Sequence, residues 1–146
     1  MVNIDELLVP RHCVSNNLQK TARAVSRLYA EEMRPAGLTR AQFPILSVLD
    51  ALGPLPMTVL ADRLYMERTT LTRHLRPLVE AGFVERPENP EDARVRMVAI
   101  AVAGRHKLKE ARRLWETAQT RMIERFGAEA WQQLEDALRT LRRLTR

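Results

Sequence analysis

The stretch that decides the fold lies between residues 57 and 101 and reads MTVLADRLYMERTTLTRHLRPLVEAGFVERPENPEDARVRMVAIA. Its first half carries apolar residues at helical spacing and predicts two helices, about 57–64 and 67–81, joined by a tight turn. Its second half predicts two strands, 83–86 and 94–101, on either side of a polar tip rich in turn-forming residues. Helix, turn, helix and hairpin in this order are typical of a winged helix-turn-helix.

The second helix of this pair is expected to have one apolar and one polar face. Leu71, Leu75 and Leu78 fall within about 60° of one another at 100° per residue, so they define the buried stripe. The opposite face carries hydroxyl and guanidinium groups, which suit phosphate oxygens and the base edges of the DNA major groove. The expected DNA contacts of this helix are Arg68, Thr69, Thr70, Thr72, Arg73 and Arg76, with Arg68 closest to the phosphate backbone.

The charge of the chain and of the predicted hairpin agrees with a DNA partner. The sequence holds 24 basic and 18 acidic residues, a net charge of +6, and all but three of the basic residues are arginine. Guanidinium groups bind phosphate through two parallel hydrogen bonds, which an ammonium group cannot do. We expect Arg94 and Arg96, on the returning strand, to contact DNA, and Arg94 to reach the adjacent minor groove.

The segments that flank this stretch predict long helices. Apolar residues recur every three or four positions over about 11–33, and Thr39 with Gln42 forms a capping box that opens another helix before Gly53. Leu52 and Val59 are expected on the buried sides of their helices. Two further helices fill residues 102–144, broken at Gly127, and their apolar stripes require helical partners. We therefore expect a mainly α protein with a small β-hairpin wing, built as one unit over 1–146.

Other classes of protein are disfavoured by what the sequence lacks. A single cysteine excludes an intramolecular disulfide, and the three histidines have no ligand spacing, so neither a metal nor another cofactor is expected. No apolar run approaches the roughly 20 residues of a membrane helix, and the first residues lack a leader pattern, so we expect a cytoplasmic protein with no membrane partner. No glycine-rich phosphate loop or nucleophile motif is present, which argues against an enzyme.

The chain resembles the MarR-type transcriptional regulators over about residues 12–144. The motifs that carry the resemblance are Thr39-Arg40-Ala41-Gln42-Phe43, Leu60-Ala61-Asp62-Arg63-Leu64, Arg68-Thr69-Thr70-Leu71-Thr72-Arg73, Gly82-Phe83-Val84-Glu85-Arg86 and Asp92-Ala93-Arg94, followed by Gly104. The resemblance implies a homodimer, with dimerisation helices at about 11–34 and 102–144 and a DNA-binding part at about 39–101. It also implies that Asp92 orients Arg94. Ala101 departs from the family pattern, because a hydroxyl residue usually caps the long helix there.

Within such a family the expected function is that of a repressor, which binds a pseudo-palindromic operator and is released by a small aromatic or phenolic effector or by oxidation. One alternative is a peroxide sensor of the same fold that uses Cys13, which opens the first helix where the helix dipole favours a thiolate. In that subgroup tyrosines assist the cysteine; Tyr29 matches one such position, while Arg40 replaces another. A further alternative is a helical interaction protein that binds acidic partners instead of DNA.

Overall fold

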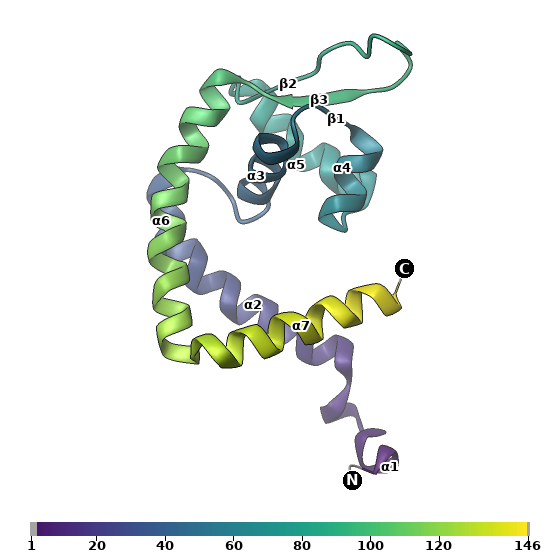
Figure 1. Ribbon diagram of the computed structural model, residues 1–146, viewed down its shortest axis with the longest axis vertical. Helices are drawn as coiled ribbons and strands as arrows, with labels where there is room; N and C mark the ends of the chain where they lie inside the picture. The colour runs from purple at the N-terminus through teal and green to yellow at the C-terminus, as the bar shows by residue number, and fades with distance from the viewer. Residues whose placement is uncertain (1–2, 146) are drawn as a thin grey trace.

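The computed structural model describes residues 3–145 as a helical chain with one small sheet (Figure 1). Residues 1, 2 and 146, which the expected single unit includes, lie outside the described residues. The elements in chain order are α1 (Ile4–Leu7), the 3₁₀ turn η1 (Pro10–His12), α2 (Val14–Met33), the 3₁₀ turn η2 (Arg34–Ala36), α3 (Gln42–Leu52), β1 (Leu55–Pro56), α4 (Met57–Leu64), α5 (Arg68–Glu80), β2 (Val84–Glu85), β3 (Met97–Ile100), α6 (Val102–Phe126) and α7 (Ala128–Leu144). The mainly α fold with a β wing is confirmed.

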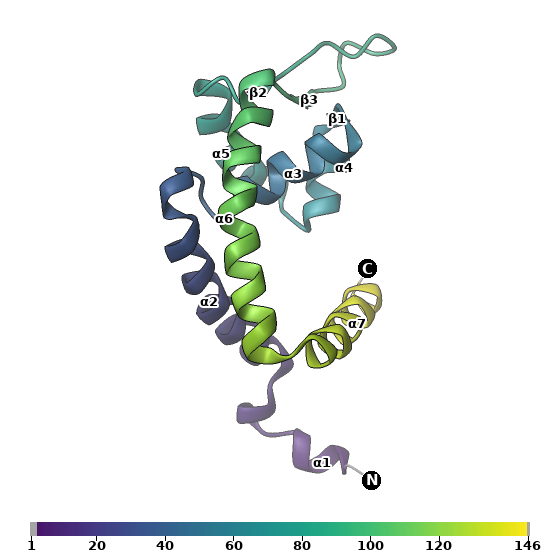
Figure 2. The same ribbon diagram turned by 60° about the vertical axis from the view of Figure 1, so that its left-hand side comes forward.

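The two longest helices, α2 and α6, lie side by side and carry the winged part at one end (Figures 1 and 2). Two polar contacts join them, from the Tyr29 hydroxyl to the Gln119 side chain and from Arg121 to Glu32. The chain turns at Gly127, whose φ of 93° is strained for any residue with a Cβ, and α7 leaves from the end of α6. The predicted break between the last two helices is therefore confirmed.

The winged part forms around a leucine-rich core. Helices α3, α4 and α5 pack against one another and against the sheet, as Figure 1 shows. The predicted stripe of α5 is buried, and residues of β3 and α6 close the core from the other sides. The largest fully buried side chains are Ile45, Leu46, Leu49, Leu60, Leu71, Leu75, Leu78, Val98 and Leu108.

The sheet has three antiparallel strands in the order β1-β3-β2. Leu55 pairs with Val98 and Val84 pairs with Ile100, so β3 is the central strand. The hairpin of the prediction is present, but its strands are shorter than expected, because residues 86–96 form the irregular wing and two prolines there have no N–H to donate. The strand β1 was not predicted, since two residues carry no periodic signal.

Most local predictions for α3 and α4 hold, with two corrections. The capping box is formed: Thr39 Oγ1 accepts from the Gln42 N–H at 3.3 Å, and Gln42 Oε1 accepts from the Thr39 N–H at 3.0 Å. Leu52 was wrongly expected to be buried; it is 52% exposed, because it is the last residue of α3 and lies beyond the packed turns. Val59 is 37% exposed, and the buried side of α4 is formed by Met57, Leu60 and Ala61 instead.

The start of α6 is fixed by packing and not by a cap. Ala101 is the N-cap residue and makes no side-chain cap hydrogen bond, as its sequence predicts. Its N–H donates instead to the Phe83 carbonyl at 3.0 Å. Gly104 lies against the same carbonyl, so closely that a Cβ at this position would be 2.0 Å from the Phe83 oxygen. Glycine at residue 104 therefore allows α6 to pack directly on the chain that enters β2.

A candidate nucleic-acid interface

Helix α5 separates its apolar and polar residues as predicted. Its leucine stripe faces the core, while the side chains of Arg68, Thr69, Thr72, Arg73 and Arg76 are exposed. Thr70 is half-buried, so it lies on the flank of the helix and not at the centre of the polar face. The exposed side of α5 thus presents hydroxyl and guanidinium groups along about three turns, and no described element covers it.

Two contacts on this polar face were not foreseen from the sequence. The Thr72 hydroxyl donates to the Arg68 carbonyl at 2.8 Å, and the residue remains exposed. Arg76 Nε donates to Glu80 Oε1 at 2.9 Å, with the arginine side chain 80% exposed. An exposed pair of this kind contributes only about 0.3–0.5 kcal/mol to stability, so Arg76 can exchange its carboxylate partner for a phosphate at little cost.

The wing is ordered by a chain of short polar contacts that ends at Arg94. Asn89 Oδ1 accepts from the backbone N–H groups of Glu91 and Asp92 at 2.8 and 3.3 Å, which closes the turn at the tip. Asp92 Oδ1 then accepts from the backbone N–H of Arg94 at 2.9 Å and from its Nε at 3.3 Å. Asp92 thus contacts Arg94 as the resemblance implies, and the Arg94 side chain as a whole remains 94% exposed.

The role of Asn89 in closing the turn of the wing was not predicted from the sequence. Its signal was the dipeptide Asn89-Pro90, a known turn former, with an acidic residue three positions after the asparagine. The amide of Asn89 also contacts Met97 Sδ at 3.7 Å, which links the tip of the wing to β3. The wing is therefore held at its base and at its tip.

The wing and helix α5 meet at one cleft. Arg68 from α5 and Arg94 and Arg96 from the wing line a depression of about 390 Å³, together with Pro56, Met57, Thr58 and Val95. The Met57 N–H donates to the Arg96 carbonyl at 2.9 Å, which holds the returning strand against the start of α4. No acidic side chain belongs to the lining, and Asp92, the ion-pair partner of Arg94, lies outside it. The three arginines therefore give the cleft an excess of positive charge that suits phosphate.

Thr58 is the second residue that sequence reasoning missed. It is exposed in the first turn of α4 and lines the same cleft as the three arginines. The first helix of a helix-turn-helix crosses the DNA backbone, and hydroxyl groups there commonly bind phosphate. That general position in the motif was the signal that could have identified it.

The residues expected to serve other chemistry lie apart from this cleft. Cys13 is exposed at the N-cap of α2, in the part of the chain that leads away from the winged part (Figure 1). Its carbonyl accepts from the Asn17 side chain at 2.9 Å. Within residues 3–145 no group of three or more histidine, cysteine or acidic side chains could hold a metal ion.

A separate cavity lies where α2, α3 and α6 meet. It has a volume of about 430 Å³ and is lined mainly by apolar and aromatic groups, among them Tyr29, Met33, Phe43, Pro44 and Trp115. The rings of Phe43 and Trp115 are stacked, with centroids 6.0 Å apart. Burial raises the pKa of the Tyr29 phenol above its ordinary value of 10.0, so at neutral pH the hydroxyl keeps its proton and donates to Gln119.

These features define a class of protein: a winged helix-turn-helix whose polar recognition helix and arginine-bearing wing lie on one surface. The sequence profile of the MarR family matches residues 38–95. The HTH-type transcriptional regulator YwoH of Bacillus subtilis is 28% identical over 116 residues, 80% of this chain and 78% of its own length.

Solved structures of transcriptional regulators are similar to this chain over more of its length. The transcriptional regulator MosR of M. tuberculosis, in complex with DNA, is 30% identical, with a TM-score of 0.82 over 91% of this chain and 96% of that one. The transcriptional repressor CouR, bound to a 23-mer DNA duplex, is 26% identical, with a TM-score of 0.83 over 97% and 98% of the two chains. The chain belongs to the MarR family and is a DNA-binding transcriptional regulator. None of the helices within residues 3–145 combines the length and apolar character needed to cross a bilayer.

Proposed function

We propose that this MarR-family regulator is a repressor that binds a pseudo-palindromic operator as a homodimer. The observation that carries the proposal is the shared surface of α5 and the wing, where the exposed arginines converge on one cleft. In this proposal residues 39–101 bind DNA, whereas the helices at 11–34 and 102–144 form the dimer. Both parts belong to one structural unit that spans residues 1–146.

Each protomer contacts DNA through two elements in the proposal. Helix α5 enters the major groove, where Thr69, Thr70, Thr72, Arg73 and Arg76 face base edges and flanking phosphates. Arg68 binds the phosphate backbone at the cleft, and Arg94 and Arg96 follow the adjacent minor groove. Two copies related by a twofold axis would place their α5 helices about 34–36 Å apart, one turn of DNA.

The dimer is supported by apolar surface that the protomer leaves uncovered. The only extensive contact of α7 within residues 3–145 is with α6, so its stripe of Trp131, Leu134, Leu138 and Leu141 stays partly exposed. Val14 and Leu18 at the start of α2 are exposed as well. Apolar stripes on helices at one end of a molecule are typical of an interface between two copies.

The release of DNA is assigned to a small aromatic or phenolic effector in the cavity between α2, α3 and α6. This cavity lies between the winged part and the long helices, so a bound ligand can favour one relative position of the two. A ligand with different affinities for two states of the dimer shifts the equilibrium between them, and operator affinity changes by the same factor.

The experiment that tests the proposal starts from selection of a binding site out of random duplex DNA. Light scattering should give the mass of a dimer, and the selected site should be a pseudo-palindrome; a monomer on a single half-site would contradict the proposal. In transcription assays the protein should lower the output of a promoter that overlaps the site, whereas a rise in output would identify an activator.

Two arginines of α5 should respond differently to substitution. Arg73→Ala should relax base preference at the position it faces, because a lost bidentate base contact costs about 1–3 kcal/mol of discrimination. Arg68→Ala should weaken all duplexes alike and lower the salt dependence of binding by about one phosphate contact per protomer. The matched control is Arg113→Ala on α6, an exposed arginine outside both the proposed DNA contacts and the apolar residues proposed for the dimer, which should change neither property.

A further inference from the structure

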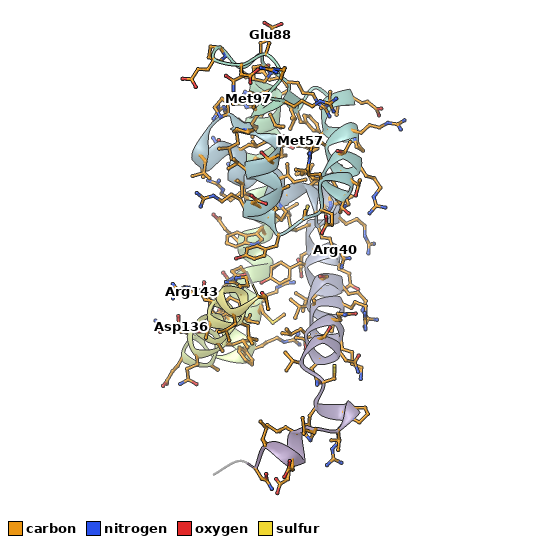
Figure 3. All side chains as sticks on the ribbon, turned by 90° about the vertical axis from the view of Figure 1, so that its right-hand side faces the viewer. Arg40, Met57, Glu88, Met97, Asp136 and Arg143 are labelled. Carbon is orange, nitrogen blue, oxygen red and sulfur yellow. The ribbon has the colours of Figure 1, made fainter. Side chains whose placement is uncertain are left out.

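Met97 lies at the point where the wing returns to the sheet. It is the first residue of β3, and Figure 3 shows it at the end of the molecule that carries the wing, below Glu88. Its partner across the sheet is Pro56 of β1. The Met97 sulfur, Sδ, lies 3.7 Å from Asn89 Nδ2 and accepts a hydrogen bond from it. A thioether therefore contacts the irregular segment that leads to Arg94.

A continuous series of polar contacts connects this sulfur with Arg94. Asn89 donates to Met97 through its amide nitrogen. The amide oxygen of Asn89 accepts from the backbone N–H groups of Glu91 and Asp92 and so closes the turn at the wing tip. Asp92 in turn accepts from the backbone N–H and the Nε of Arg94. Because one amide group makes the first two of these contacts, a change at the sulfur is passed on to the turn that positions Arg94.

Met97 combines partial exposure with a polar contact of its sulfur. Met33 and Met57 are buried, with 7% and 5% of their surface exposed, which shields them from an oxidant in solution. Met66, Met97 and Met122 are half-buried. Among the methionines within residues 3–145, Met97 alone accepts a side-chain hydrogen bond through its sulfur. Oxidation of Met97 therefore acts on a defined contact, whereas oxidation of the other two half-buried methionines does not.

We propose that Met97 is a modification site at which hypohalous acids form methionine sulfoxide, and that the sulfoxide displaces the wing and weakens operator binding. The thioether and hypochlorous acid give the sulfoxide, chloride and a proton. Sulfur gains the oxygen atom and loses two electrons, which chlorine accepts. Methionine sulfoxide reductases reverse the modification. The weakening of operator binding rests on the proposed contact of Arg94 with DNA, whereas the site of oxidation does not.

The sulfoxide disturbs the contact with Asn89 whichever way its oxygen points. Oxidation makes the sulfur a chiral centre, so two epimers form. A hydrogen bond from nitrogen to oxygen takes about 2.7–3.2 Å. An oxygen that points toward Asn89 therefore does not fit within the 3.7 Å between sulfur and nitrogen, and it pushes the amide away. Where the oxygen points elsewhere, the sulfur carries a partial positive charge and is a poorer acceptor for the amide.

The expected loss of operator affinity is about tenfold per dimer, because a displaced wing must be ordered again on binding in each half-site. The guanidinium of Arg94 remains present, so the loss is smaller than the loss expected when Arg94 is replaced by alanine. The fold itself should persist. The residues that follow Met97 in β3, Val98, Ala99 and Ile100, are buried in the core and hold the sheet in place.

The test is mild oxidation of the folded Cys13→Ser protein by hypochlorous acid, because serine removes the thiol as a competing site. Mass spectrometry of proteolytic fragments should locate a sulfoxide at Met97. Fluorescence anisotropy with a labelled operator should show about tenfold weaker binding after oxidation. Methionine sulfoxide reductases should restore the affinity, and circular dichroism should show an unchanged helix content, which separates displacement of the wing from unfolding.

Substitution of single methionines assigns the effect to one sulfur. Met97→Leu, made in the Cys13→Ser protein, should bind the operator equally before and after treatment, because leucine has no sulfur to oxidise. The controls Met66→Leu and Met122→Leu remove the other half-buried sulfurs and should still lose about tenfold on treatment. Met97→Gln places a polar amide where the sulfoxide would form, so without any oxidant it should bind more weakly than Met97→Leu.

Two results would overturn the inference: a Met97 that stays unmodified while the protein remains folded, or an equal loss of affinity on treatment in Met97→Leu. A sulfoxide at Met97 with unchanged operator affinity would overturn the displacement of the wing. Arg94→Ala then shows what failed. If its affinity is also unchanged, the proposed contact of the wing with DNA is wrong, and if its affinity falls, only the displacement is wrong.

Discussion

Replacing Arg94 by alanine should weaken operator binding at least about a hundredfold while leaving the fold intact. The Arg94 side chain is 94% exposed and its ion-pair partner is Asp92, so the substitution should change the free energy of unfolding by less than about 1 kcal/mol. A hydrogen bond from a charged group to DNA contributes about 1.5–3 kcal/mol. With one such contact in each half-site, the dimer should lose about 3–6 kcal/mol of binding free energy.

Asp92→Asn distinguishes a residue that positions Arg94 from one that merely lies nearby. The substitution removes a negative charge close to DNA, which by itself would strengthen binding to phosphates. It also replaces the charged acceptor of Arg94 Nε by a neutral amide, so the guanidinium samples more conformations and must be ordered on binding. Weaker binding by Asp92→Asn would therefore show that positioning outweighs the gain in charge.

Fluorescence anisotropy with a labelled operator, repeated across a range of salt concentrations, measures both effects. Arg94→Ala should lower the slope of log affinity against log salt by about two per dimer, whereas Asp92→Asn should not lower it. Thermal unfolding followed by circular dichroism serves as the control for folding. Unchanged affinity and slope in Arg94→Ala would refute the assignment of the wing, and tighter binding by Asp92→Asn would refute the positioning role.

Three further predictions concern other parts of the chain. Gly104→Ala should destabilise the protein by about 1–3 kcal/mol or more in chemical denaturation, because its Cβ would meet the Phe83 carbonyl at 2.0 Å; full stability would mean that the contact relaxes freely. The pKa of Tyr29 in the folded protein should lie above its ordinary value of 10.0. The stability that the protonated phenol contributes is therefore complete below pH 10 and is lost as the pH rises through the pKa of the folded state. An absorbance titration compared with that of Tyr29→Phe checks this. The thiol-sensor alternative predicts that an organic hydroperoxide lowers the operator affinity of the unmodified protein but not of Cys13→Ser, and full affinity after oxidation would exclude it.

The parts of the fold that could be predicted are those governed by contacts close in the chain. The capping box of Thr39 and Gln42, the leucine stripe of α5 and the break at Gly127 depend on residues three or four positions apart or on one backbone angle. Leu52 and Val59 were misplaced because periodicity identifies an apolar face but does not say how far a neighbouring element covers it.

The candidate site was predicted as a set of residues but not as an arrangement. The exposed face of α5 follows from helical spacing alone, and only Thr70 lies away from its centre. Arg68 shares a cleft with Arg94 and Arg96. This proximity depends on packing between segments that lie more than 25 residues apart in the chain. Thr58 enters the same cleft for that reason, and no pattern in its own segment marks it.

The sequence by itself determined the helices, their buried faces and the arginine-rich character of the recognition helix and wing, because side chains at fixed spacing along a helix share a face whatever surrounds them. Tertiary structure alone decided the pairing of Leu55 with Val98 and the cleft that Arg68 shares with Arg94 and Arg96. Both bring together residues that are distant in the chain, and such contacts depend on how whole elements pack and not on local preference.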